Sequence, residues 1–301
     1  MHNKIIQGCM RIDHISKDEL YLLIKKELEL GINFFDHADI YGRKNAFTQE
    51  QIFGEILEEH PELRSKMIIQ TKCGIIPTPT GPYYDSSKAH ILTQVEKSLK
   101  DLHVTYLDYL LIHRPDALMN PQEIAEAFDY LEQSGKVKHF GVSNFNVSQM
   151  KYLQKFVHQK LEVNQLQFSL CHTNLIDGEF FTNMDIDENA NVNEDLMYYC
   201  KENNIIVQAW SPFQFGFFEG VFIDNLKFHE LNSMLEDLAK KYNTTKNGIA
   251  AAWIIKYGDN MMVINGSTNI KRVSGLVNAN YIQLTKEEWY NLYRLAGHKL
   301  P

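Results

Sequence analysis

The sequence has few of the features that mark disulfide-rich, membrane-spanning or nucleic-acid-binding proteins. Its four cysteines are scattered without CxxC spacing, so we expect neither a disulfide framework nor a metal site. No apolar run approaches the ~18 residues of a membrane-spanning helix, and the N-terminus carries no signal-peptide core. A net charge of −8 argues against nucleic acid or an anionic membrane as the main partner. We therefore expect a protein of the reducing cytoplasm.

The sequence also has no segment typical of a linker between domains. No proline- or serine-rich stretch, charge block or low-complexity segment divides the 301 residues. The composition, 44% hydrophobic and 23% charged, is that of an ordinary globular protein. Because α/β barrels of this length commonly form one domain, we predict a single domain spanning residues 1–301.

Short apolar runs alternate along the chain with segments of helical spacing. One helix is expected to begin at a capping box of Ser16 and Glu19 and to end at Gly31. Another should begin at Asn120-Pro121, because proline is favoured at the first helical position. The expected strands are residues 5–10, 34–36, 67–72, 107–113, 137–142, 163–168, 205–210 and 261–264.

Eight strands separated by helices imply parallel βαβ units, and eight such units fit a closed (β/α)8 TIM barrel. A doubly wound open sheet is the alternative. Such sheets usually place a glycine-rich turn after the first strand, and the segment from Gln7 to Arg11 is not that turn.

The C-terminal ends of these strands carry polar or aromatic side chains. In a barrel these ends converge on one face, where active sites lie. Any one of these residues alone could be solvated or packed, but their recurrence at the same end predicts a shared site. They are Asp36, Lys72, His113, Ser143, Asn144, Gln165, Trp210, Ser211, Gly266 and Ser267.

The residue types predict proton donation to a carbonyl. Tyr41, on the loop after Asp36, has an ordinary pKa near ~10, and a cation within about 4–6 Å would lower that pKa. Lys72 can be this cation, held charged by Asp36, while His113 can donate a hydrogen bond to a substrate oxygen. None of these side chains supplies a hydride, so a cofactor is required. Its expected contacts include Ser143, Asn144, Gln165 and Trp210.

The ordered motifs resemble those of the aldo-keto reductase superfamily, and more closely its bacterial oxidoreductases with the Asp-His-Ala-Asp-Ile-Tyr-Gly motif. The similarity covers essentially the whole chain. The matching motifs are Gln7-Gly8, Asp36 to Gly42, Lys72-Cys73-Gly74, Ile112 to Asp116, Gly141 to Phe145, Asn164-Gln165, Ala209 to Pro212, and Gly266-Ser267 with Arg272.

The resemblance implies a (β/α)8 barrel that reduces aldehydes or ketones with hydride from NADPH, with NADH as a weaker cofactor. It implies Tyr41 as the general acid, Lys72 and Asp36 as its tuning pair, and His113 orienting the carbonyl. The implied cofactor contacts are Ser143, Asn144 and Gln165 at the carboxamide, Trp210 stacked on the nicotinamide ring, and Ser211, Gly266, Ser267, Thr268 and Arg272.

Two departures from the family pattern leave questions open. Many relatives carry a lysine where Gly266 stands, which leaves Arg272 and a helix N-terminus after Asn269 to bind the 2′-phosphate. The phenylalanine-rich loop 213–222 could pack on the barrel rim or act as a lid.

The alternative function is a cofactor-binding redox sensor or regulatory subunit with slow turnover. For the enzyme we expect a small-molecule carbonyl substrate and a monomer or small homo-oligomer.

Overall fold

The structure is a computed structural model, and it describes residues 3–42, 48–181, 184 and 195–301. Eight strands follow one another in the order of a closed barrel, β1-β12-β9-β8-β7-β6-β3-β2, which confirms the (β/α)8 prediction over the open sheet. Their bounds are β1 Ile5–Gly8, β2 Phe34–Asp36, β3 Ile68–Cys73, β6 Leu107–Ile112, β7 Val137–Ser143, β8 Leu161–Gln167, β9 Ile206–Trp210 and β12 Met261–Asn265.

Helices lie between the strands, and several begin where capping residues predict. Complete capping boxes at Ser16 and Thr48 open the first two helices, and Asn120 caps a helix with Pro121 in its first turn. The helices are α1 Lys17–Glu29, α2 Gln49–Glu59, α3 Lys88–Asp101, α4 Pro121–Gln133, α5 Val147–Gln154, α6 Leu196–Glu202, α7 His229–Lys241, α8 Lys246–Tyr257, α9 Ile270–Leu276 and α10 Lys286–Leu295.

The chain groups into two compact units. The N-terminal unit comprises Ile6–Gln165 and Gly266–Thr268, and the C-terminal unit comprises Met1–Ile5, Leu166–Asn265 and Asn269–Pro301. The prediction of one domain over residues 1–301 stays a prediction.

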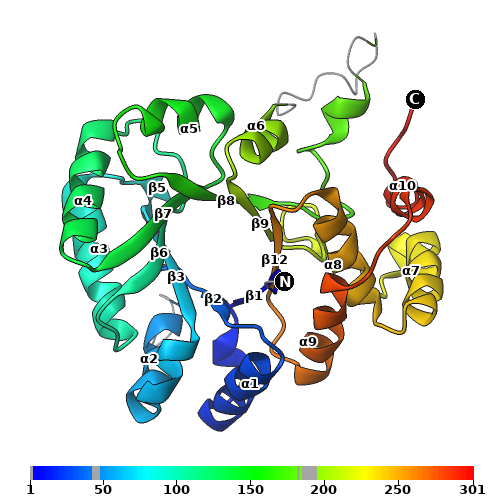
Figure 1. The fold of residues 1–301 in the computed structure, drawn as a ribbon, viewed down its shortest axis with the longest axis horizontal. Helices are drawn as coiled ribbons and strands as arrows, with labels where there is room; N and C mark the ends of the chain where they lie inside the picture. The colour runs from blue at the N-terminus through cyan, green and yellow to red at the C-terminus, as the bar shows by residue number, and fades with distance from the viewer. Residues whose placement is uncertain (1–2, 43–47, 182–183, 185–194) are drawn as a thin grey trace. The chain divides into compact units, whose positions relative to one another are not determined.

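In the N-terminal unit, strands β2, β3, β6 and β7 run side by side with helices α1 to α4 on their outer side (Figure 1). The parallel register aligns Asp36 with Gln70, and Lys72 with Leu111. Ser143 pairs in the same way with Gln165. The register therefore brings the polar strand ends to one edge of the sheet.

In the C-terminal unit, β9 pairs with β12, and two tryptophans join helix α8 to α10. The rings of Trp253 and Trp289 stack with centroids 4.7 Å apart. Each indole N–H donates to the other residue's backbone carbonyl at 3.0 Å. Because both buried N–H groups are satisfied, the two helices are held in register as well as packed. In the described ranges, none of the helices combines the length and apolar character that crossing a membrane requires.

Two short hairpins were not expected from the sequence. One pairs β4 (Ile75–Ile76) with β5 (Tyr83–Tyr84), and the other pairs β10 (Gln214–Phe215) with β11 (Gly220–Val221). Strands of two residues are too short for the alternation of apolar and polar side chains that marks a longer strand. The first strand is also shorter than predicted, because it ends at Gly8.

One buried carboxyl group has no role in the strand-end cluster. Glu27 lies on the inner face of α1 with 0% of its surface exposed, and neither of its oxygens has a hydrogen-bond partner among the described residues. Burial raises the pKa of Glu27 well above its usual value. The folded protein therefore holds Glu27 protonated over a wider pH range than the unfolded chain does.

We expect Glu27→Gln to reduce the loss of stability that the wild-type protein shows as the pH rises above about 4.3. Below the unfolded pKa of ~4.3, Glu27 is protonated in the folded and the unfolded state, and its contribution to the free energy of unfolding is most favourable. As the pH rises from there through the raised folded pKa, the contribution is lost, at up to about 1.4 kcal/mol per pH unit. Urea unfolding from pH 4 to pH 9 measures this slope in wild type and variant. The control is Glu29→Gln, at an exposed position of the same helix, and parallel curves for wild type and Glu27→Gln would contradict the assignment.

Candidate active site

The centre of the site is a buried ion pair between β2 and β3. The ammonium Nζ of Lys72 lies 2.6 and 2.7 Å from the two carboxylate oxygens of Asp36, and 2.7 Å from the backbone oxygen of His37. The Lys72 side chain is 0% exposed, so its three N–H donors are all used by protein acceptors. Burial lowers the pKa of Lys72, and the Asp36 carboxylate opposes that shift.

Tyr41 lies beside this pair, on the loop that leaves β2. The Lys72 ammonium is 5.3 Å from the centre of its ring, and the His113 ring is 6.2 Å away, edge-on. The structure thus brings together the four residues predicted for catalysis: Asp36, Tyr41, Lys72 and His113.

The pKa of Tyr41 differs from the sequence expectation. It is raised well above the usual value, first by burial and then by the nearby Asp36, Cys9 and Asp39. The nearby Lys72 ammonium does not offset these effects in this structure, so the pKa is raised rather than lowered. Tyr41 is accordingly neutral near pH 7 in this state and carries the proton that a general acid needs.

His113 follows β6 and faces the same cluster. Burial, followed by the positive charges of Lys72 and Arg114, lowers the pKa of His113 well below its usual range. The ring is therefore neutral near pH 7 and can donate one hydrogen bond. Its backbone is fixed, because its N–H donates to the Cys73 carbonyl at 2.8 Å and its carbonyl accepts from the Asn144 amide at 3.4 Å.

The ends of β7 and β8 add a group of amides and a hydroxyl. The Ser143 hydroxyl donates to the Gln165 carbonyl at 2.9 Å, and the Asn144 amide donates to the Ser143 oxygen at 2.8 Å. Asn144 has a positive φ of 62°, which asparagine tolerates better than most residues. The Gln165 side chain donates to Asp36 Oδ1 at 3.0 Å, which joins this group to the ion pair.

Sequence reasoning missed Gln70. Its side-chain amide donates to Asp36 Oδ1 at 2.6 Å, so this single oxygen accepts from Gln70, Lys72 and Gln165. Gln70 precedes Lys72 by two residues, and alternation along β3 places both side chains on the same face. That spacing was the available signal.

The remaining predicted cofactor residues are divided between the units. Gly266, Ser267 and Thr268 belong to the N-terminal unit, where the Gln7 amide donates to the Ser267 carbonyl at 3.4 Å. Trp210, Ser211 and Arg272 belong to the C-terminal unit, and their cofactor contacts stay predictions.

One part of the phosphate prediction needs correction. The Asn269 side chain accepts from the N–H groups of Lys271 and Arg272 at 3.0 and 3.2 Å, so it caps α9. These N–H groups were expected to be free for a phosphate at the helix N-terminus, and the cap already satisfies them.

The phenylalanine-rich loop has an inner and an outer set of rings. Phe222 is fully buried, and its ring lies 6.4 Å from that of Phe228. Phe217 and Phe218 are 69% and 51% exposed, and Phe218 stacks on Trp210 at 6.1 Å. Packing therefore accounts for the inner rings of the loop.

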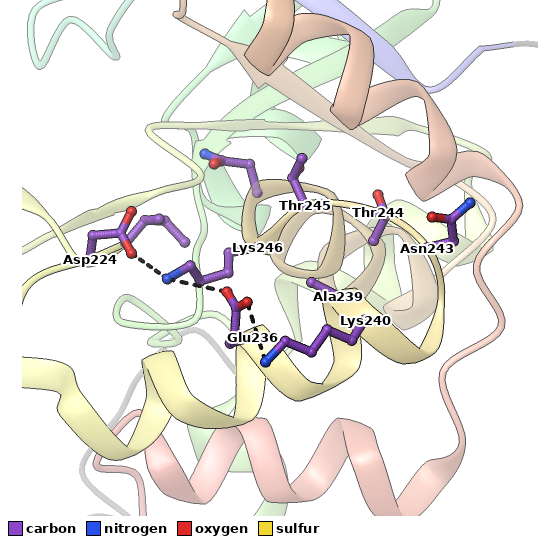
Figure 2. Close-up of a pocket in the computed structure, with 10 residues that line it drawn as sticks. Asp224, Glu236, Ala239, Lys240, Asn243, Thr244, Thr245 and Lys246 are labelled. Atoms are coloured by element: carbon purple, nitrogen blue, oxygen red, sulfur yellow. Dashed lines mark hydrogen bonds and ion pairs between the residues drawn. The ribbon is translucent and has the colours of Figure 1, made fainter.

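A separate hollow of about 490 Å³ lies within the C-terminal unit, at the turn between α7 and α8 (Figure 2). Lys246 pairs there with Asp224 and, at 3.6 Å, with Glu236. Glu236 also pairs with Lys240 at 3.5 Å. The two lysines that line this hollow are thus both neutralised by carboxylates of its own wall.

A model of the Aldo/keto reductase family matches residues 4–296. The chain therefore belongs to this family and is an oxidoreductase. It is 35% identical over 311 residues to the uncharacterized oxidoreductase YcsN of Bacillus subtilis, covering 99% of this chain and 96% of that protein. It is 33% identical over 305 residues to a 6-dehydroglucose reductase of Agrobacterium fabrum, covering 98% and 94%.

Solved structures agree with the fold. A crystal structure of an aldo-keto reductase from Klebsiella pneumoniae in complex with NADPH superposes with a TM-score of 0.77 at 22% identity, covering 99% of this chain and 92% of that one. A second Klebsiella pneumoniae structure, in complex with NADP and acetate, has a TM-score of 0.75 at 21% identity, covering 99% and 92%. At these identities the likeness shows the shared barrel.

Proposed function

We propose that this protein reduces aldehyde or ketone carbonyls to alcohols with NADPH, using Tyr41 as the general acid. The observation that carries the proposal is the buried Asp36–Lys72 pair, with Tyr41 and the neutral His113 beside it. Family membership and the NADPH-bound structures of related proteins support the choice of reaction and cofactor.

The chemistry of the N-terminal unit fits a nicotinamide cofactor. Ser143, Asn144 and Gln165 offer hydroxyl and amide groups, which match the donors and acceptors of a carboxamide. When bound, the cofactor supplies the hydride that no side chain of the site can provide.

The side chains of the protein donate the proton and polarise the substrate carbonyl. Tyr41 donates its phenolic proton to the carbonyl oxygen as negative charge develops there. His113, being neutral, donates a hydrogen bond to the same oxygen. The Lys72 ammonium then stabilises the phenolate left on Tyr41, since it lies 5.3 Å from the ring centre.

Consumption of NADPH with a panel of aldehydes, α-dicarbonyls and quinones tests this function. The panel includes 6-dehydroglucose, because two relatives at 33% and 30% identity are 6-dehydroglucose reductases. Turnover with any member supports the reductase. Tight cofactor retention without turnover would instead support a cofactor-binding sensor or regulatory subunit.

The four described cysteines are all free thiols, which supports the proposed cytoplasmic location.

We expect Arg272→Ala to weaken NADPH binding and to leave NADH binding unchanged. The guanidinium of Arg272 is exposed and suited to a phosphate. Loss of one charge-assisted hydrogen bond corresponds to a roughly 10- to 150-fold change in affinity. Calorimetric titration of both cofactors measures the change, with Arg294→Ala on α10 as the control. Equal affinities of the wild-type protein for NADPH and NADH would contradict the role of Arg272.

A further inference from the structure

The backbone at Gly266 faces open space that is bordered by a single cation. A β-carbon added to Gly266 would meet one described atom within 4 Å, the Nη1 of Arg11 at 3.9 Å. Gly266 is not among the glycines with positive φ, so a side chain at this position would cause no backbone strain. A side chain, or a ligand group of similar size, therefore has room at this position beside the Arg11 guanidinium.

The charge of Arg11 has no counterion in the described part of the chain. Arg11 follows β1 and is partly buried, yet its guanidinium makes no hydrogen bond or ion pair there. Arg64, a second partly buried arginine of the same unit, bonds the Met67 and Tyr106 carbonyls and the Asp108 carboxylate. A partly buried guanidinium usually finds such partners, so an unpaired one beside an open space suggests an anionic ligand.

Hydrogen bonds hold Arg11 and Gly266 in the same neighbourhood. The Gln7 side chain donates to the carbonyls of both Gly8 and Ser267, which joins the end of β1 to residues 266–268. The Cys9 N–H donates to the Asp36 carbonyl at 2.9 Å, which ties the same loop to the ion pair of the active site.

We propose that Arg11 selects NADPH over NADH by binding the 2′-phosphate of the cofactor. This inference rests on the proposed function and on the predicted contacts of residues 266–268 with that cofactor. The planar fork of a guanidinium suits the oxygens of a phosphate. It also accounts for the glycine, because a lysine at position 266 would begin 3.9 Å from the guanidinium and add a like charge beside it. The positive charge that binds the 2′-phosphate can therefore come either from Arg11 or from a lysine at position 266.

The test is equilibrium binding of each cofactor, which does not depend on turnover. Calorimetry gives the dissociation constants of NADPH and NADH for the wild type, Arg11→Ala and Lys97→Ala, the last removing an exposed charge elsewhere in the unit. We expect Arg11→Ala to weaken NADPH binding by roughly 10- to 150-fold and to leave NADH binding unchanged. Lys97→Ala should change neither constant. Thermal melting checks folding, and Arg11→Gln is the second variant if Arg11→Ala does not fold.

A double variant that moves the positive charge from position 11 to position 266 provides a second test. Adding Gly266→Lys to Arg11→Ala should restore much of the NADPH preference, because the lysine has open space at that position. Equal weakening with both cofactors, or no weakening with either, would overturn the assignment of Arg11. If the wild-type protein binds both cofactors with equal affinity, the assignments of Arg11 and Arg272 to the 2′-phosphate both fail, while the proposed carbonyl reduction stands. If it binds neither, the proposed function fails as well.

Discussion

Replacing Tyr41 with phenylalanine should abolish carbonyl reduction while NADPH binding stays nearly unchanged. In the described part of the site, Tyr41 is the proton donor that has a cation near its ring, with the Lys72 ammonium 5.3 Å from the ring centre. The change removes one hydroxyl and keeps the ring that packs edge-on against His113. Loss of a general acid lowers turnover by about 10²–10⁴-fold.

The measurement is steady-state turnover with the best aldehyde of the panel, alongside calorimetric binding of NADPH. Tyr130→Phe is the matched control, because Tyr130 is exposed on α4 and lies outside the site. Residual activity above about a tenth of the wild-type rate, far more than loss of an acid allows, would show that another group protonates the product.

Lys72→Met should be as damaging to turnover as the tyrosine change. Methionine keeps most of the length of the side chain but removes the charge that stabilises a Tyr41 phenolate. The Asp36 carboxylate would then lie beside Tyr41 without its counterion, which opposes loss of the tyrosine proton. We expect turnover to fall by at least about 10²-fold, the scale of acid–base catalysis.

The design of this experiment must separate catalysis from folding. Breaking a buried ion pair by removing one partner costs about 3–5 kcal/mol of stability. The double variant Lys72→Met with Asp36→Asn removes both charges, so it should recover much of the lost stability and none of the activity. Near-normal turnover with an unchanged pH profile in Lys72→Met would contradict the role of the ammonium.

Local signals in the sequence predicted most of the architecture. The capping box at Ser16 and the Asn120-Pro121 pair predicted the starts of two helices, because both signals lie within a few residues of the helix start. Neither of the two short hairpins was predicted, because their two-residue strands form through pairing and show no periodicity in the sequence.

The active site was predictable as a set of residue types, but its hydrogen bonds were not. Asp36, Lys72 and His113 stand at strand ends, and their recurrence at one end of the strands together with their residue types led to their prediction. The bond from Gln165 to Asp36 spans 129 residues and depends on the register of the barrel strands. The raised pKa of Tyr41 depends first on burial and then on the nearby Asp36, Cys9 and Asp39, and neither effect can be read from spacing. The nearness of Arg11 to Gly266 joins opposite ends of the chain and left no sequence signal.

The three hydrogen bonds of Lys72 have a chemical consequence for a site proposed to bind aldehydes. An amine condenses with an aldehyde to a Schiff base only when its nitrogen has a free lone pair. Three oxygen acceptors surround the Lys72 nitrogen, and each requires an N–H, which only the protonated form can supply to all of them. With its side chain 0% exposed, Lys72 is also beyond the reach of the substrate carbon. In the proposed mechanism, Lys72 would therefore be protected from covalent capture by an aldehyde substrate.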